Sequence, residues 1–192
     1  MARASAADAA RTAQRILESA TDLFAARGFA EVSLDDVARA AGVTRGAVYH
    51  HYDNKTGLFT AVAARVQSDV AQAVVAAATD AGPLPSDQLR AGSHAFLDAI
   101  TRGAAVRILL IDAPAVIGWQ EWRRLDGENS AIHLRDALRD VGVAEELLDA
   151  STAQLSGAMN EAALWISRQD DAHTARARSH AALDALLAVY AP

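Results

Sequence analysis

The sequence predicts an all-α protein, and three observations carry that prediction. The 192 residues include only four prolines, so few positions interrupt a helix. Alanine-rich stretches run through much of the chain, and alanine has the highest helix propensity. Apolar residues recur at the three- and four-residue spacing of an amphipathic helix. We expect about nine helices, divided between a first domain over residues 1–52 and a second over residues 53–192.

The first helix is expected over residues 10–27, after a mobile arm at residues 1–9. One side of this segment is apolar at helical spacing, and Gly28 follows it at a position where glycine commonly ends a helix. The apolar side consists of Ile16, Leu17, Ala20, Leu23 and Phe24.

A helix-turn-helix is expected next. Ser33, followed three residues later by the carboxylate of Asp36, forms the capping-box pattern that begins a second helix. Gly42 occupies the position where a left-handed residue ends that helix, and Thr44 can cap a third helix. Two short helices joined by a glycine-containing turn present the second of them to the major groove of DNA. Residues 1–52 are therefore predicted to form a three-helix DNA-binding head.

The third helix has an unusual surface for its length. Val48 points inward, and the residues that can point outward are Arg45, Gly46, Tyr49 and His50. Arginine is the best donor to guanine edges, and tyrosine and histidine can reach phosphates or stack on base methyl groups. In the alternative interpretation, the aromatic and basic residues only pack a small helical domain.

A phosphate contact is expected where the fourth helix begins. Asn54 can cap that helix, and its first turn contains Lys55, the only lysine in the chain. A helix start gathers unpaired backbone N–H groups and the positive end of the helix dipole, which together favour phosphate.

Residues from about 11 to 60 resemble the DNA-binding head of the TetR family of bacterial transcriptional regulators. The residues that carry the resemblance are Ile16, Leu17, Leu23, Phe24, 27–29, Ser33, Val37, Ala38, 41–43, Gly46, Val48, Tyr49, His51, Tyr52, Lys55, Leu58 and Phe59. The resemblance implies DNA contacts of two kinds. Contacts to the bases or their sugars are implied for Arg45, Gly46, Tyr49 and His50, and contacts to the phosphate backbone for Ser33, Thr44, His51 and Lys55.

The formal net charge of −6 does not favour nucleic-acid binding, but the acidic excess lies outside the head. Residues 1–60 carry seven Lys or Arg and seven Asp or Glu, so the remainder carries 18 − 7 = 11 basic and 24 − 7 = 17 acidic residues. The net charge of the head is therefore compatible with DNA binding but is not evidence for it.

Six helices are expected beyond the head. They are a helix over about 55–79, a helix capped by Ser86 or Asp87 that reaches Ile100, a short buried helix within 106–122, and helices over about 119–141, 144–168 and 172–190. Periodicity does not separate a strand from a buried helix in the apolar segment 106–122, but no second strand exists to pair with it. We expect a break near Asp112 and Pro114, and a loosening of the following helix near Gly127.

The last two predicted helices carry more apolar surface than one monomer needs. A second copy of the chain would pack them into a four-helix interface, whereas the alternative is an ordinary monomer core. A dimer also suits the expected function, because one short recognition helix reads few base pairs. The expected interface residues are Leu155, Met159, Ala162, Ile166, Leu183 and Leu186.

The middle of the chain predicts a ligand cavity with apolar walls and few polar groups, a common form of small-molecule site. In the TetR family this region holds an effector. The expected lining is Phe96, Ile108, Ile111, Trp119, Trp122, His133 and Met159, although each could instead belong to the core.

The sequence contains no signature of catalysis, and we expect neither a metal ion nor a cofactor. It has no cysteine, no glycine-rich phosphate loop and no nucleophile elbow. His50 and His51 diverge by about 100° on a helix and cannot easily chelate one ion. No apolar run approaches ~18 residues, and the N-terminus lacks the apolar core of a signal peptide. A cytoplasmic protein without a membrane span is expected.

Together these features predict a homodimeric, ligand-responsive transcriptional regulator. It would bind an inverted-repeat operator in double-stranded DNA as a repressor and leave it when a small, mainly hydrophobic effector binds. The alternative is a TetR-like helical carrier of apolar small molecules that does not bind DNA.

Overall fold

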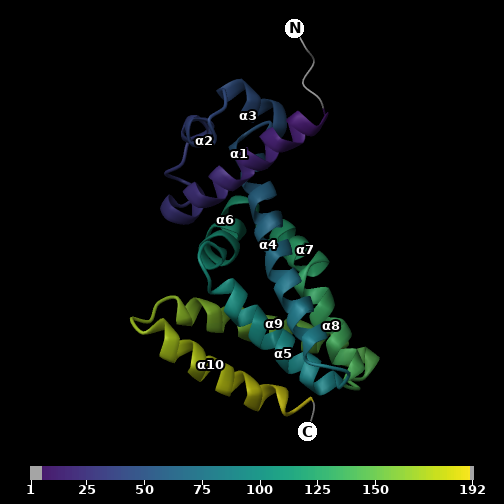
Figure 1. Ribbon diagram of the computed structural model, residues 1–192. Helices are drawn as coiled ribbons and strands as arrows, with labels where there is room; N and C mark the ends of the chain where they lie inside the picture. Colours follow the sequence, from purple (N-terminus) through teal and green to yellow (C-terminus); the bar gives the residue numbers. More distant parts are fainter. Residues whose placement is uncertain (1–5, 191–192) are drawn as a thin grey trace.

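The computed structural model describes residues 6–190, which form helices and turns without a strand (Figure 1). The expected all-α class is confirmed. Three helices form the head, α1 (Ala6–Arg27), α2 (Leu34–Ala41) and α3 (Arg45–Tyr52). The long helix α4 (Lys55–Asp80) leads from this head into a larger helical body.

The first helix begins at Ala6 rather than at residue 10, so residues 6–9 are helical and the prediction of a mobile arm is wrong there. Three of these four residues are alanine, and Asp8 in the first turn interacts favourably with the helix dipole. Residues 1–5, the rest of the predicted arm, lie outside the described residues.

The body consists of the helices that follow α4. They are α5 (Pro85–Ile100), the π-helix η1 (Val106–Asp112), α6 (Ala113–Val116), α7 (Trp119–Glu128), α8 (Ser130–Asp140), α9 (Glu145–Ile166) and α10 (Ala172–Leu187). In Figure 1, α10 crosses the end of the body that lies farthest from the head. Helix α4 packs along α5, and α10 packs against both α5 and α9.

The break predicted near Asp112 and Pro114 lies elsewhere in the structure, whereas the loosening predicted near Gly127 is a complete break two residues later. Helix η1 continues into α6 through Ala113, and Pro114 lies within this continuous helical segment without breaking it. The chain turns instead at Gly118, whose φ of 85° suits glycine. The segment predicted as one helix over residues 119–141 forms two helices, because Asn129 leaves the helical conformation with φ −121° and ψ −91°.

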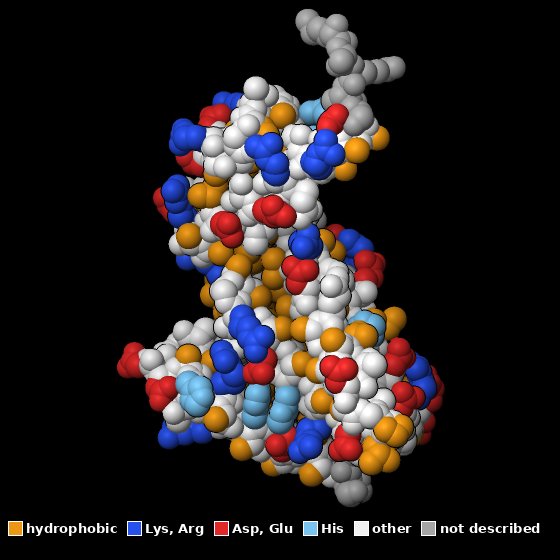
Figure 2. All heavy atoms as spheres, viewed as in Figure 1, with side chains coloured by type: hydrophobic (Ala, Val, Ile, Leu, Met, Phe, Trp, Pro, Cys, Tyr) orange, Lys and Arg blue, Asp and Glu red, His pale blue; other side chains and the backbone are white. Residues whose placement is uncertain are grey.

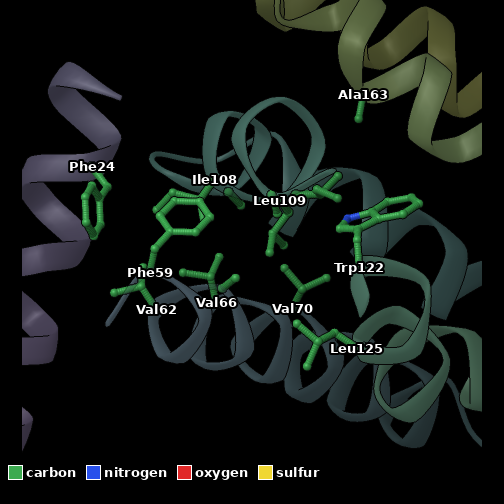
Figure 3. Packing of buried hydrophobic residues seen from close by; sticks show 14 of the residues in the cluster. Phe24, Phe59, Val62, Val66, Val70, Ile108, Leu109, Trp122, Leu125 and Ala163 are labelled. Carbon is green, nitrogen blue, oxygen red and sulfur yellow. The ribbon is translucent and has the colours of Figure 1, made fainter. Parts of the chain in front are cut away.

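One continuous hydrophobic cluster joins the head to the body. Phe59 of α4 contacts Phe24 of α1 edge to face, with ring centroids 5.2 Å apart. Figure 3 shows that α4 then presents Val66 and Val70 to the side of the cluster formed by Leu109 of η1 and by α7. Because α4 contributes to both ends of this core, it fixes the position of the head relative to the body.

Candidate DNA-binding surface and ligand cavity

The turn between α2 and α3 has the capping geometry that the sequence predicts. The backbone N–H of Asp36 donates to Ser33 Oγ (3.1 Å), and the N–H of Ser33 donates to Asp36 Oδ2 (3.0 Å). The hydrogen bonds from Ser33 lower the pKa of the Asp36 carboxyl. Gly42 takes the left-handed conformation (φ 62°), and Thr44 Oγ1 accepts from the N–H of Ala47. These local contacts fix where the third helix begins.

Helix α3 is held by its inner face and exposes its outer face. Val48 is fully buried, and the Tyr52 hydroxyl donates to the carbonyl oxygen of Ala13 in α1 (2.9 Å). The four residues predicted to contact bases or their sugars are exposed, as expected: Arg45, Gly46, Tyr49 and His50. His51 is only half-buried, and its ring lies 5.3 Å from that of His50.

The exposed guanidinium of Arg45 is already paired in the protein. Its NH1 lies 3.1 Å from Asp35 Oδ2, and its NH2 donates to the Tyr49 hydroxyl (3.1 Å). The guanidinium carbon lies 5.3 Å from the centroid of the Tyr49 ring. The hydrogen bond with Tyr49 and the charge of Asp35 raise the pKa of Arg45, so it remains a cation.

The start of α4 is capped as expected, because Asn54 Oδ1 accepts from the N–H of Gly57 (2.8 Å). Lys55 Nζ donates to the carbonyl oxygen of Ala30 (3.2 Å) and lies 4.3 Å from the centroid of the Phe29 ring. The lysine thereby joins α4 to the loop between α1 and α2. One hydrogen bond uses one of its three donors, which leaves donors for a phosphate.

A shallow groove brings part of the predicted DNA surface together. Its lining includes the predicted residues Ser33, Arg45, Tyr49 and Lys55. The other four predicted residues lie outside the groove lining: Thr44, Gly46, His50 and His51. Two acidic residues that the sequence pattern did not single out, Glu31 and Asp35, also line it. The surface of the head is therefore neither uniformly positive nor uniformly negative. Figure 2 shows basic side chains interspersed with acidic ones over it.

A cavity of about 230 Å³ lies in the body between α4, α5, α8 and α9. Three of the seven predicted ligand residues line it: Phe96, His133 and Met159. The other four do not line this cavity. Ile108 and Trp122 are buried in the core, whereas Ile111 and Trp119 are exposed by 53% and 63%. The observed lining differs from the predicted one because the cavity forms where α4, α5, α8 and α9 leave space between them. The most apolar segment of the chain does not border that space.

Two buried polar residues of the cavity, Asp126 and Ser130, were not predicted. Asp126 is only 4% exposed, and its two carboxylate oxygens accept from Gln67 Nε2 and Arg123 NH1, each at 3.0 Å. Burial raises the pKa of Asp126 in spite of Arg123, Gln67 and Ser156. Ser130 Oγ is buried in the lining without a hydrogen-bond partner among the described residues. In the sequence both residues belong to a polar run, which gives no sign of burial.

Most of the residues predicted at the dimer interface are buried by other residues of the same protomer. Leu155, Met159, Ile166 and Leu183 are all at least 96% buried, and Ala162 is half-buried. Leu186 is 49% exposed. The outer side of α9 and the end of the chain expose two other large apolar residues, Trp165 (40%) and Val189 (78%). An amphipathic pattern identifies a buried face, but it does not say which chain buries it.

Among residues 6–190, no three or more His, Asp or Glu side chains are arranged to hold a metal ion. Within the same part of the chain, every helix is too short or too polar to cross a membrane.

Two family models match the chain in consecutive stretches. Residues 16–62 match the model described as bacterial regulatory proteins, tetR family. Residues 86–189 match the model described as tetracyclin repressor-like, C-terminal domain. The second match alone covers more than half of the chain, and the two matches leave only α4 beyond Val62 and the α4–α5 turn between them.

The chain is similar to individual known proteins over different fractions of its length. The HTH-type transcriptional regulator SrpR of Pseudomonas putida is 49% identical over 67 residues, which are 35% of this chain and 32% of that protein. The probable acrEF/envCD operon repressor of Escherichia coli (strain K12) is 48% identical over 59 residues, or 31% of this chain and 27% of that protein. The chain thus spans about a third or less of these two curated relatives. The crystal structure of a TetR-family transcriptional regulator from Pectobacterium atrosepticum is similar over 95% of both chains, with 33% identity and a TM-score of 0.74.

Proposed function

The chain belongs to the TetR family of bacterial regulatory proteins, and from that premise we propose that it is a ligand-responsive transcriptional regulator. The observation that carries the proposal is the exposed face of α3 with Arg45, Tyr49 and His50. This helix is anchored by Val48 and Tyr52, so its outer side chains are free to enter the major groove. Ser33, Thr44, Gly46, His51 and Lys55 complete the proposed DNA surface.

We propose that the DNA head covers residues 1–52 and the effector-binding and dimerisation body residues 53–192. Two heads are needed to read an inverted repeat, with recognition helices about 34 Å apart. The outer face of α9 and α10 supports a homodimer, because Trp165 and Leu186 are large apolar residues left exposed in one protomer. Ala162, half-buried on α9, would lie at the edge of this interface.

The cavity in the body is the proposed effector site. Its walls are mainly apolar, and three aspartates line it, Asp126, Asp136 and Asp140, of which the first two pair with Arg123 and Arg139 outside the lining. Because the lining among the described residues holds acceptor oxygens but no Lys or Arg, we propose a small, mainly apolar molecule whose polar end donates hydrogen bonds. Ser130 Oγ, which has no hydrogen-bond partner within residues 6–190, offers a buried polar group to such a ligand.

Helix α4 connects the effector site to the DNA surface. It lines the cavity with Val74 and Ala78 and begins beside the head at Lys55. An effector that wedges α4 away from α8 would change the separation of the two heads, so that they no longer fit successive major grooves. An effector that binds the released form ~100-fold better shifts this equilibrium by ~2.7 kcal/mol. We propose that the protein is a cytoplasmic repressor released in this way.

The proposal is tested by thermodynamic linkage. A ligand found by thermal-shift screening should lower operator affinity, and operator DNA should lower ligand affinity by the same factor. Fluorescence anisotropy of labelled operator and calorimetry of the ligand measure the two factors. A protein that bound ligand but no specific DNA would instead be the helical carrier.

A further inference from the structure

Asp35 lies beside the base-reading side chain of the proposed recognition helix. Its carboxylate pairs with Arg45 at 3.1 Å, across the turn between α2 and α3. Arg45 is held on its other side by the Tyr49 hydroxyl. The guanidinium that would reach a guanine is therefore oriented before DNA arrives.

This ion pair has little value for folding. The side chains of Arg45 and Asp35 are 60% and 52% exposed, and exposed pairs of this kind contribute little to stability. Asp35 also lies in the first turn of α2, whose N-terminus would otherwise attract a phosphate. It thus places a negative charge where DNA backbone would approach.

We propose that Asp35 is a specificity-determining residue of the DNA surface, an inference that rests on the proposed function. A phosphate that competes for Arg45 carries a charge that Asp35 repels. The O6 and N7 acceptors of guanine are uncharged and take two guanidinium donors at once. Asp35 therefore penalises backbone contacts made on any sequence more than the base contact made on the correct one. Discrimination against wrong partners commonly depends on such a repulsive element.

Glu31 provides a matched control. It is exposed and lines the same groove, and no ion pair joins it to Arg45 among the described residues. Asp35→Asn and Glu31→Gln each remove one negative charge with little change in side-chain volume, but only the first removes the negative charge paired with Arg45.

The experiment measures dissociation constants for the wild type and both variants on the selected operator and on an unrelated duplex, over a range of salt concentrations. Asp35→Asn should raise affinity for the unrelated duplex about tenfold and raise operator affinity less, so the ratio of the two falls several-fold. Glu31→Gln should raise both affinities alike and leave the ratio unchanged. An unchanged ratio in Asp35→Asn, or an equal fall in both variants, would overturn the inference. Wild-type protein without sequence preference would instead contradict the proposed function itself.

Discussion

Asp112 of η1 accepts a hydrogen bond from the backbone N–H of Phe29, 83 residues earlier in the chain (3.0 Å). The same carboxylate oxygen lies 3.8 Å from Arg107 Nε, and Arg107 NH2 donates to the carbonyl oxygen of Arg27 (3.2 Å). A side chain at Gly28, which has a φ of 80°, would collide with the Arg107 guanidinium. The end of α1 and the π-helix of the body are therefore joined by a close polar contact.

We expect Asp112→Ala to weaken the response of the head to the effector. The variant leaves the N–H of Phe29 without its partner, which costs about 1 kcal/mol in the free energy of unfolding. The factor by which a ligand lowers operator affinity should fall, because one link between η1 and the head is lost. Fluorescence anisotropy with and without ligand measures this factor. The control is Asp22→Ala on the exposed side of α1, and an equal factor in both variants would exclude a role for Asp112 in coupling.

We expect Leu186→Glu to convert the protein to a monomer. Leu186 is 49% exposed in one protomer, so glutamate is tolerated there by the fold, but a buried charge without a partner costs several kcal/mol at an interface. Light scattering gives the mass. Leu84→Glu in the α4–α5 turn changes another exposed leucine (59%) and should remain dimeric. A dimeric Leu186→Glu variant would place the interface elsewhere.

Stability should fall as the pH falls through about 6.5, and His180 should account for part of the loss. Burial, and then the charge of His94, lowers the pKa of His180 below its ordinary 6.5 in spite of Asp98 and Asp184; Arg176 acts in the same direction as His94. The unfolded chain then takes up its proton first, so acid favours unfolding between 6.5 and the lower folded pKa, and this effect vanishes above that range.

The measurement is the midpoint of thermal unfolding between about pH 5 and 8. His180→Gln should flatten the dependence of this midpoint on pH, because it removes the imidazole whose pKa is lowered by burial and by the stacked ring of His94, 4.2 Å away. His173→Gln changes an exposed histidine of the same helix and should keep the wild-type slope. Identical slopes in all three proteins would show that His180 does not contribute.

We expect Ala78→Phe to lower ligand affinity about tenfold or more while the free protein keeps its operator affinity. Ala78 lines the cavity from α4, and a phenyl ring there would fill the space that a ligand needs. Calorimetry checks the first effect and anisotropy the second. Trp122→Ala is a contrasting change, because Trp122 is 7% exposed in the core and its loss should cost about 3–5 kcal/mol of stability. Unchanged ligand affinity in Ala78→Phe would place the effector outside this cavity.

The sequence predicted the head well because its signals are local. The capping box of Ser33 and Asp36, the left-handed Gly42 and the cap at Thr44 each act within a few residues, so the second and third helices can be located without knowledge of tertiary packing. The exposed side of α3 followed from the same reasoning, because Val48 and Tyr52 define its inner face.

The residues that line the cavity and those left exposed on α9 and α10 could not be predicted in the same way. Ile111 and Trp119 are apolar yet exposed, whereas Asp126 and Ser130 are polar yet buried, because neighbouring helices determine what each residue meets. The contact between Asp112 and Phe29 depends on the same non-local packing. Periodicity identifies a face of a helix, but only the assembled fold identifies the partner of that face.

The most direct test of specific DNA binding is selection of genomic fragments by the full chain, followed by sequencing. We expect enrichment of one inverted repeat. Arg45→Ala should lose preference at one base position in each half-site, and Lys55→Ala should weaken binding to all sequences and reduce the salt dependence by about one phosphate contact. Failure of the wild-type protein to enrich any sequence over unrelated DNA would contradict its assignment as a specific regulator.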